Sequence, residues 1–239
     1  MLTSLAFALL VGGCAQKKDV DAMDARLKEV EEKVAKMEKG GGKAGPSASP
    51  EDEEAASNLM KEAQEALKAN QYDVAKTKLA ELKDKYGSTR AGRASARMMS
   101  EVAIIGTDAA PLDVDKWFQG KASLADSKAT LVIFWEAWCP HCKEEMPKMP
   151  EVYHKWKGKG LNVVGMTKVT KSATDEKVES FIKENKIDFP VGKEKDGALS
   201  KAYNVSGIPA AALVKDGKIV WRGHPAKLTD EMIGQFLNG

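Results

Sequence analysis

The sequence predicts an α/β fold with a mixed central sheet and helices on both faces, preceded by an all-helical segment. From about residue 106 onward, short apolar runs alternate with amphipathic stretches, and the last two apolar runs are close enough to form a hairpin. Alternating strands and helices, followed by a hairpin and a helix, are typical of a mixed sheet covered on both faces. Residues 51–105 are instead rich in Ala, Leu, Lys and Glu, which favours helix throughout.

Size and charge exclude some classes of protein. The chain has 239 residues, enough for one full hydrophobic core and substantial further segments. Its 37 Lys and Arg residues nearly balance 35 Asp and Glu residues, so the formal net charge is only +2 and indicates no nucleic-acid partner. The three cysteines are one near the N-terminus and one Cys-x-x-Cys pair, which differs from the even, dispersed set of a disulfide-stapled scaffold.

The N-terminal residues 1–13 form an apolar run that is too short to span a bilayer and is typical of a secretory signal. Val11-Gly12-Gly13-Cys14 then resembles the lipobox of bacterial lipoproteins, although no Lys or Arg precedes the apolar run. The resemblance implies cleavage before Cys14, a lipid on Cys14 and a periplasmic location. Ala15 after the cysteine implies the outer membrane of a Gram-negative bacterium. An uncleaved hydrophobic anchor is the alternative, and it leads to the same compartment.

Residues 14–39 are predicted to form a short coiled-coil helix. Apolar residues at spacings of 3, 4, 3, 4 and 3 form its seam: Val20, Met23, Leu27, Val30, Val34 and Met37. This seam favours a homo-oligomer through residues 20–37, and a single solvated spacer helix is the alternative because the seam covers under three heptads. Residues 40–50, rich in Gly, Ser and Pro, are predicted to form a flexible linker.

Residues 51–105 are predicted to form three helical runs, separated at residues 70–71 and 86–89. Small and aromatic residues in these runs resemble a tetratricopeptide repeat over about one and a half repeats: Ala63, Ala66, Leu67, Tyr72, Ala75, Leu79, Leu82, Tyr86 and Ala94. Such a hairpin buries its apolar face only by stacking, so it must pack against the following domain, another subunit or a partner. An ordinary helical hairpin is the equal alternative.

Residues 106–239 are predicted to form the sheet and its helices. Residues 129–135 and 161–167 are strand-like, and residues 210–214 and 218–222 form a hairpin around Asp216-Gly217. Helices are expected at three positions between these strands and once after them: residues 141–157, 174–186, 196–204 and 227–238.

The sequence Trp138-Cys139-Pro140-His141-Cys142 follows an apolar strand and opens a helix. The helix N-terminus favours a thiolate at Cys139, and a dipolar or protonated His141 would add to that effect. Two intervening residues bring the two thiols within disulfide reach across one helical turn. Cys139 is therefore expected to attack a disulfide, and Cys142 to resolve the mixed disulfide that results.

These motifs together resemble the thioredoxin superfamily, and within it the TlpA-like branch of membrane-tethered oxidoreductases, over residues 106–239. Residues 134–142 are similar to the active-site strand and motif of that family, and Glu145-Met146-Pro147 matches its extension. Gly207-Ile208-Pro209 resembles the cis-proline loop, which implies that the backbone of Ile208, beside Pro209, pairs with a substrate segment. The resemblance implies a thioredoxin fold and a thiol-disulfide oxidoreductase.

The resemblance also implies how protons move at the site. Ile133 stands where thioredoxins carry a buried Asp, and Glu145 is the candidate replacement as proton acceptor for Cys142. Glu136 is the second candidate. His224 is interpreted as a loop residue. No cofactor is expected beyond the redox-active Cys139–Cys142 disulfide, and no metal, because the chain has no second cysteine pair to complete a zinc site.

Protein thiols or disulfides are the expected substrates, and a membrane redox partner is expected to reset the cysteine pair. A TlpA-like reductase is the first hypothesis, whereas Pro140-His141 resembles the dipeptide of oxidising DsbA-type enzymes and leaves the direction of electron flow open. Two other hypotheses are an oligomeric oxidase or isomerase, and an adaptor lipoprotein that binds a partner through its helical repeat.

Overall fold

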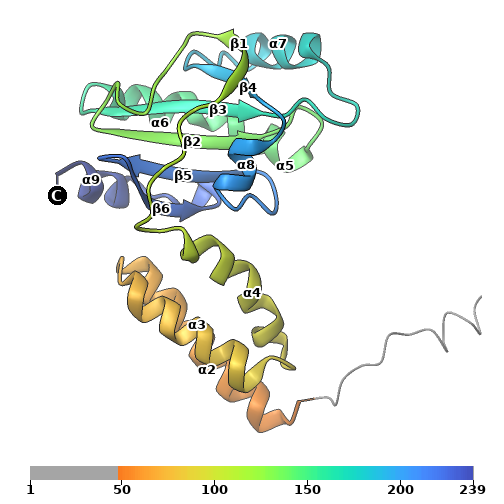
Figure 1. Ribbon diagram of the computed structural model, residues 1–239, viewed down its shortest axis with the longest axis vertical. Helices are drawn as coiled ribbons and strands as arrows, with labels where there is room; N and C mark the ends of the chain where they lie inside the picture. Colours follow the sequence, from red (N-terminus) through yellow and green to blue (C-terminus); the bar gives the residue numbers. More distant parts are fainter. Residues whose placement is uncertain (1–47, 239) are drawn as a thin grey trace, which may run out of the picture. The chain divides into compact units, whose positions relative to one another are not determined.

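The computed structural model describes residues 48–238, and a six-stranded mixed sheet forms the centre of its larger part (Figure 1). The predicted signal at residues 1–13, the lipidation of Cys14, the coiled coil at 14–39 and most of the linker at 40–50 lie outside these residues. Within residues 48–238, no helix has the length and apolar character needed to cross a membrane.

The strand order is β1-β4-β3-β2-β5-β6. β3 pairs in parallel with β2 and β4, whereas the other neighbouring pairs are antiparallel. This is the predicted mixed sheet. The strands are β1 (Val114–Gln119), β2 (Ala129–Trp135), β3 (Leu161–Thr167), β4 (Val191–Glu194), β5 (Ala210–Lys215) and β6 (Lys218–Gly223).

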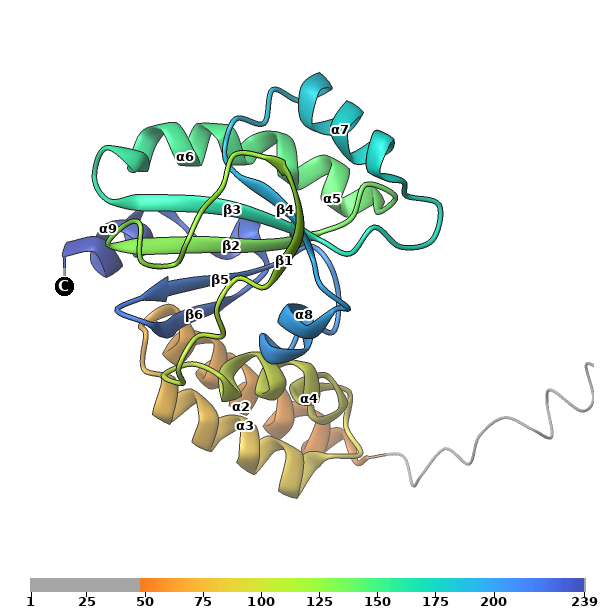
Figure 2. The ribbon, with the colours of Figure 1, turned by 45° about the horizontal axis from the view of Figure 1, so that its top comes forward.

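Both faces of the sheet are buried, and alternate residues of β2 serve opposite faces. Leu131, Ile133 and Trp135 pack in one core cluster with residues of the helices on that face. These helices are α5 (Pro140–Glu145), α6 (Met149–Lys157), α7 (Asp175–Glu184) and α9 (Asp230–Asn238). Val132 and Phe134 pack in the other cluster with α8 (Ala198–Ala202) and with side chains from residues 104–124. Figure 2 shows α5, α6 and α7 on one side of the sheet and α8 on the other.

Two strands of the sheet were not predicted. The six residues of β1 are all half-buried or exposed, so they do not alternate between buried and exposed positions. β1 forms the edge of the sheet by antiparallel pairing with β4. β4 has only four residues and follows Pro190. Both strands depend on partners far away in the sequence, so periodicity within a short window does not reveal them.

The single helix predicted at residues 141–157 is wrong, because the structure has two helices there. α5 ends at Glu145, a short 3-10 turn covers Met146–Lys148, and α6 begins at Met149. Pro147 has no N–H to donate to the preceding turn, and its ring disfavours a continuous helix. Pro150 occupies the first turn of α6, where a missing N–H costs nothing. This break limits the helix that carries the cysteines to six residues.

The three predicted helical runs of residues 51–105 are three helices: α2 (Pro50–Lys68), α3 (Tyr72–Tyr86) and α4 (Arg90–Ala103). The hydroxyl groups of Ser49 and Thr89 accept hydrogen bonds from the first turns of α2 and α4 and fix where these helices begin. Buried Ala63 and Leu79 lie in the core between the helices. Ala94 is exposed instead of lying at a helix crossing, and Gly92 and Ser95 are the buried small residues of α4.

The helical segment packs against the sheet domain, one of the three arrangements that its apolar face predicted. Asn70 Nδ2 donates to Gln235 Oε1 of α9 at 3.2 Å, and Asn204 Nδ2 donates to the Ser100 carbonyl of α4 at 3.1 Å. The Gly106 amide donates to the Ile219 carbonyl of β6 at 2.8 Å. These contacts hold the helices beside the edge of the sheet.

Candidate functional site

The two cysteines lie where β2 passes into α5. Cys139 is the N-cap residue of α5, and Pro140 occupies the first turn, where its fixed φ suits the start of a helix. The Cys139 amide donates to the Glu136 carbonyl at 3.1 Å, and the Lys143 amide donates to the Cys139 carbonyl at 3.1 Å. Cys139 is 5% exposed and Cys142 is fully buried at 0%, and both are free thiols. Both thiols are therefore buried, and only Cys139 keeps a small exposed area.

The environment of Cys142 disfavours its thiolate. Burial raises the pKa of the Cys142 thiol well above its ordinary value, and the neighbouring Cys139 and Glu136 act in the same direction. A hydrogen bond with the backbone of Glu136 opposes these effects without cancelling them. Cys142 therefore remains protonated at neutral pH and needs a proton acceptor before it can attack a disulfide.

The loop before β5 faces Cys139. The Ile208–Pro209 peptide bond is cis, as the resemblance predicted. The Cys139 thiol contacts the Ile208 carbonyl oxygen, with 3.7 Å between Sγ and O. Pro209 is buried and Ile208 is half-buried. The structure thus brings Cys139, Ile208 and Pro209 together from segments about 70 residues apart in the chain.

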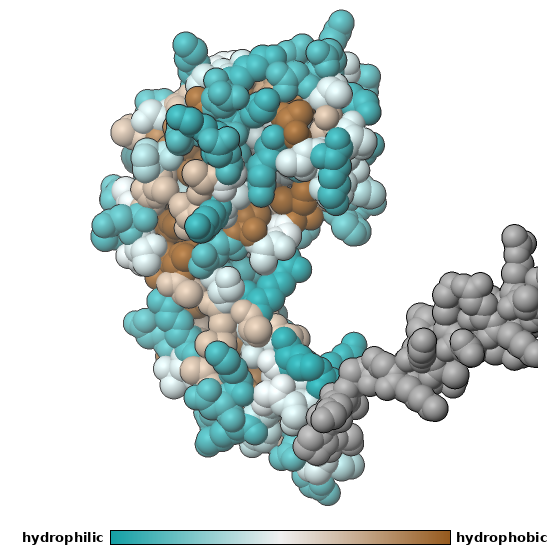
Figure 3. Space-filling model, turned by 45° about the vertical axis from the view of Figure 1, so that its right-hand side comes forward, coloured by the Kyte–Doolittle hydropathy of each residue, from teal (hydrophilic) through white to brown (hydrophobic). Residues whose placement is uncertain are grey.

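The other residues of the cysteine motif lie at the surface. Pro140 and His141 are exposed, and His141 Nδ1 lies 3.8 Å from Glu144 Oε2. The ring of Trp138 is half-buried; its Nε1 donates to Thr170 Oγ1 at 3.3 Å, and Lys171 Nζ lies 3.6 Å from the ring centroid. Figure 3 brings forward the side of the molecule that carries the start of α5. Patches of hydrophobic residues lie there among hydrophilic ones.

Glu145 lies at the end of α5, with its side chain 13% exposed. Its Oε1 accepts a hydrogen bond from Lys148 Nζ at 2.7 Å. It lines a cavity of about 370 Å³ together with Leu131, Pro225 and residues of α6 and α9. The negative charge of Glu145 also acts on the nearby His224, although burial dominates and lowers the pKa of that imidazole. The carboxylate thus faces the loop after β6.

Glu136, the second candidate, is 3% exposed. Its Oε1 accepts a hydrogen bond from Thr170 Oγ1 at 3.0 Å, and its Oε2 accepts from the Thr170 amide at 3.2 Å and from Thr167 Oγ1 at 3.4 Å. Sequence reasoning missed Thr167, Thr170 and Lys171. Thr167 ends the second predicted strand, and Thr170 and Lys171 follow it. No motif marks these residues, and only the parallel pairing of β2 with β3 brings them to the cysteines.

Two further sequence interpretations concern His224 and metals. His224 Nδ1 accepts a hydrogen bond from the Ala226 amide at 3.2 Å and so begins the short 3-10 turn Pro225–Lys227, which is a structural role in a loop. Within the described part of the chain, no group of three or more His, Cys, Asp or Glu side chains is arranged to hold a metal ion.

Comparison with known proteins gives relatives for the sheet domain. Thiol-disulfide oxidoreductase ResA of Bacillus thuringiensis subsp. konkukian is 35% identical over 111 residues, which are 46% of this chain and 62% of that protein. The chain thus spans less than two thirds of that relative. Thiol-disulfide oxidoreductase ResA of Bacillus subtilis is 30% identical over 136 residues, which are 56% of this chain and 74% of that protein.

A solved thioredoxin-like protein in the oxidised form is 26% identical and has a TM-score of 0.49 over 55% of this chain and 95% of its own. The model of the AhpC/TSA family matches residues 105–222, which run from the end of the helical segment through β6. The matched region includes both cysteines and the cis-proline loop. Together with the identity to ResA over most of that protein, this match shows that the chain belongs to the thioredoxin-like AhpC/TSA family.

Proposed function

We propose that the protein is a thiol-disulfide oxidoreductase that acts on protein disulfides outside the cytoplasm, as a TlpA-like reductase. The observation that carries this proposal is the difference between the two thiols. Cys139 keeps 5% of its surface exposed beside the Ile208 carbonyl, whereas Cys142, one helical turn away, has none exposed. A client sulfur can therefore meet Cys139 first, and Cys142 can react only with the Cys139 sulfur once the mixed disulfide has formed.

The reaction has two steps. The Cys139 thiolate attacks one sulfur of a client disulfide, so that a Cys139–client disulfide forms and the other client sulfur leaves as a thiolate. Cys142 then loses its proton and attacks Cys139 Sγ, which forms the Cys139–Cys142 disulfide and releases the second client sulfur. The client gains two electrons and the cysteine pair loses two. A dithiol donor at the membrane would restore the reduced pair.

The second step needs a base, because the pKa of Cys142 is raised by burial. Glu145 is proposed as the proton acceptor, directly or through water. Its carboxylate is mostly buried, lies one turn beyond Cys142 and pairs with Lys148. Removal of this carboxylate would slow the second step and leave the first step intact.

Paired cysteine variants of the full chain, both also carrying Cys14→Ser so that no third thiol can react, test the assignment of the two thiols. Cys142→Ser is expected to accumulate a mixed disulfide with a disulfide-containing peptide, seen as a mass increase by mass spectrometry. Cys139→Ser, the matched control, is expected to form none, because Cys142 is buried. Equal trapping by both variants, or trapping by Cys139→Ser alone, would contradict the assignment.

The reduction potential of the cysteine pair tests the direction of electron flow. The pair is equilibrated in glutathione or dithiothreitol buffers, and the fraction of disulfide is measured. We expect a value near that of thioredoxin, about −270 mV, since the proposed enzyme delivers electrons to client disulfides. A value near that of DsbA, about −120 mV, would assign the protein to oxidation or isomerisation instead.

The proposal includes a lipid on Cys14, a periplasmic location at the outer membrane, and association of chains through residues 20–37. The lipobox-like residues and the apolar seam support it. Cells that express the full chain should incorporate labelled palmitate into the protein, and Cys14→Ser should not. Sedimentation of the Cys14→Ser protein tests association; a monomer at all concentrations would remove the coiled coil from the proposal.

A further inference from the structure

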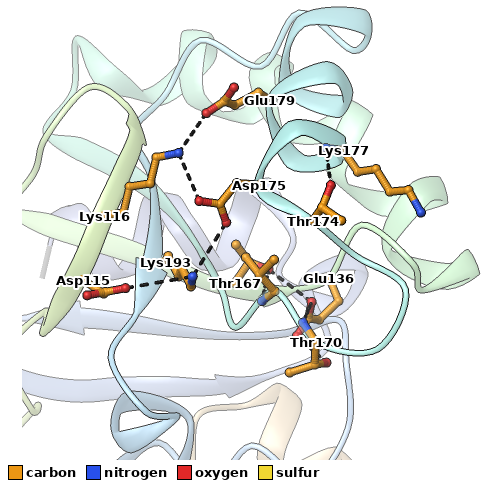
Figure 4. Close-up of polar contacts among 11 residues, drawn as sticks. Asp115, Lys116, Glu136, Thr167, Thr170, Thr174, Asp175, Lys177, Glu179 and Lys193 are labelled. Carbon is orange, nitrogen blue, oxygen red and sulfur yellow. Dashed lines mark hydrogen bonds and ion pairs between the residues drawn. The ribbon is translucent and has the colours of Figure 1, made fainter.

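The buried Glu136 side chain ties the cysteine motif to a loop of residues 168–174, which we call the β3–α7 loop (Figure 4). Three hydrogen bonds from Thr167 and Thr170 end on its carboxylate. At the same time, its backbone carbonyl accepts the hydrogen bond from the Cys139 amide. One residue therefore contacts both the turn that holds the reacting cysteine and the neighbouring loop.

Two hydrogen bonds in series join Trp138 to the Thr170 hydroxyl and that hydroxyl to Glu136. Trp138 Nε1 donates to Thr170 Oγ1 at 3.3 Å, and the same hydroxyl is within 3.0 Å of Glu136 Oε1. An indole nitrogen only donates and an ionised carboxylate only accepts, so the Thr170 hydroxyl must accept from Trp138 and donate to Glu136. The carboxylate thus orients the hydroxyl that holds the ring of Trp138, the residue directly before Cys139.

The β3–α7 loop needs such a contact because its backbone is unfavourable. Val169 and Lys171 both have φ of 57°, in the left-handed region that residues other than glycine rarely adopt. Val169 is β-branched, which makes this conformation still less favourable. Residues with such backbones keep their conformation only where the surroundings hold them, and they gather at functional sites. Thr170 lies between these two residues, and its amide and hydroxyl both donate hydrogen bonds to the Glu136 carboxylate.

The far end of the loop is held separately. Asp175, the first residue of α7, pairs with Lys116 Nζ at 3.1 Å and with Lys193 Nζ at 3.7 Å, and Thr174 caps the helix by accepting from the Lys177 amide at 3.3 Å (Figure 4). These contacts fix where α7 starts but do not reach Trp138. The position of the loop beside the cysteines therefore depends on its contacts with Glu136 and Trp138.

A cavity of about 200 Å³ is lined by residues of both the β3–α7 loop and the cis-proline loop. Its lining includes Glu136, Trp138 and Thr170 together with Gly207 and Ile208. A client segment that pairs with the Ile208 backbone would pass this cavity with one of its side chains. A shift of the loop would therefore change the surface offered to a polypeptide, whereas a small disulfide that reaches only Cys139 would not touch it.

We infer that Glu136 is a positioning residue for polypeptide clients: it holds the β3–α7 loop and Trp138 in the arrangement that receives the client segment beside Ile208. This inference rests on the proposed function. It gives Glu136 a task different from proton transfer, since three hydrogen bonds already occupy the carboxylate. Its role is to make the enzyme select polypeptide disulfides over small-molecule disulfides.

The test compares kcat and KM for two substrates of the full chain, a disulfide-containing peptide and hydroxyethyl disulfide. In Glu136→Gln, one oxygen acceptor becomes a donor, and we expect the ratio of kcat/KM for the peptide to that for the small disulfide to fall about tenfold, through KM. Thr170→Val should lower the ratio similarly, and Thr170→Ser, which keeps the hydroxyl, should restore it. Glu144→Gln, at an exposed carboxylate of α5, is the matched control and should leave the ratio unchanged.

An unchanged ratio in both Glu136→Gln and Thr170→Val would overturn the inference. So would a change that appears in kcat for both substrates alike, which would point to proton transfer. Amide hydrogen exchange adds a readout that needs no activity: residues 168–171 should exchange faster in Glu136→Gln than in the parent protein. If the parent protein reduces neither substrate, the proposed function fails, and unchanged exchange in these residues would separately overturn the positioning role.

Discussion

Glu136 and Glu145 are two carboxylates placed symmetrically in the sequence, three residues before Cys139 and three residues after Cys142. Glu136 lies at the end of a central strand, is 3% exposed and accepts three hydrogen bonds. Glu145 lies at the end of a short helix and pairs with Lys148, whose side chain is 60% exposed. Although the two carboxylates have equal spacing from a cysteine, Glu136 is buried among hydrogen-bond donors and Glu145 pairs with an exposed lysine.

The comparison indicates that the number of hydrogen-bond donors a carboxylate binds, more than its distance from the cysteine, decides whether it holds structure or transfers a proton. A carboxylate that already binds three donors is suited to hold structure, because a proton taken up there would weaken all three bonds. A carboxylate whose partner is one surface lysine can exchange that partner for a proton or a water molecule at little cost. Four predictions test this contrast, from the largest expected effect to the smallest.

The largest effect is expected on stability. Glu136→Ala should lower the free energy of unfolding of the reduced protein by about 2–4 kcal/mol, since the donors of Thr167 and Thr170 lose their acceptor in a buried position. Glu145→Ala should lower it by less than about 1 kcal/mol, as for a partly exposed ion pair. Urea denaturation followed by circular dichroism measures both. Equal losses would abolish the distinction between the two sites.

The second effect is on the resolving step. Glu145→Gln should slow the release of a thiol from a preformed Cys139 mixed disulfide by about tenfold at neutral pH, because the variant lacks the base that takes the Cys142 proton. Alkaline solution should restore the rate as hydroxide replaces the carboxylate. Rapid acid quenching and mass spectrometry follow the decay. Glu136→Gln serves as the comparison, and a greater slowing there would reverse the assignment.

The third effect is a pH dependence of stability. The pKa of Cys142 is raised in the folded protein, so below about pH 8.5 the thiol is protonated in both states and contributes no slope. Above that pH the unfolded chain ionises first, and the free energy of unfolding of the reduced protein should fall by up to about 1.4 kcal/mol per pH unit. Urea denaturation of reduced samples between pH 7 and 10 measures this fall.

Cys142→Ala should remove this part of the slope, which provides the control. Glu136→Gln should keep the slope, because burial is the largest cause of the raised pKa of Cys142 and the folded thiol stays protonated over this pH range. The Glu145→Gln protein should keep the parent slope. A slope that persists in Cys142→Ala would show that other groups cause it.

The smallest effect is expected at the partner of Glu145. Lys148→Met should change the free energy of unfolding by less than about 0.5 kcal/mol, and the difference from the parent protein should shrink further in 1 M salt, because the pair is close to solvent. Urea denaturation at low and high salt measures it. A loss as large as that of Glu136→Ala would mean that Glu145, too, is held as part of the structure.

Local pattern was enough for much of the fold. The apolar runs at residues 129–135 and 161–167, the hairpin around Asp216-Gly217 and the three helical runs of residues 51–105 are all present, because period and turn residues act within a few positions of each other. The Cys-x-x-Cys spacing likewise places Cys142 one helical turn from Cys139. These features depend on short-range geometry that every chain with this pattern shares.

Other features depended on long-range contacts. β1 exists because β4 lies beside it, although its own residues are only partly buried. Thr170 lies 34 positions from Glu136 in the chain, and the parallel pairing of β2 with β3 brings the two side chains together. No local rule sets such a pairing, since it depends on how every element shares one core.

The sequence by itself therefore determined the two cysteines, the helix that begins at them and the alternation of strands and helices. The tertiary structure decided that Cys142 is buried while Cys139 faces the Ile208 carbonyl, and that Glu136 holds a loop while Glu145 faces a cavity. The physical reason is that spacing sets which residues share a turn, whereas burial and hydrogen-bond partners are set by segments far apart in the chain.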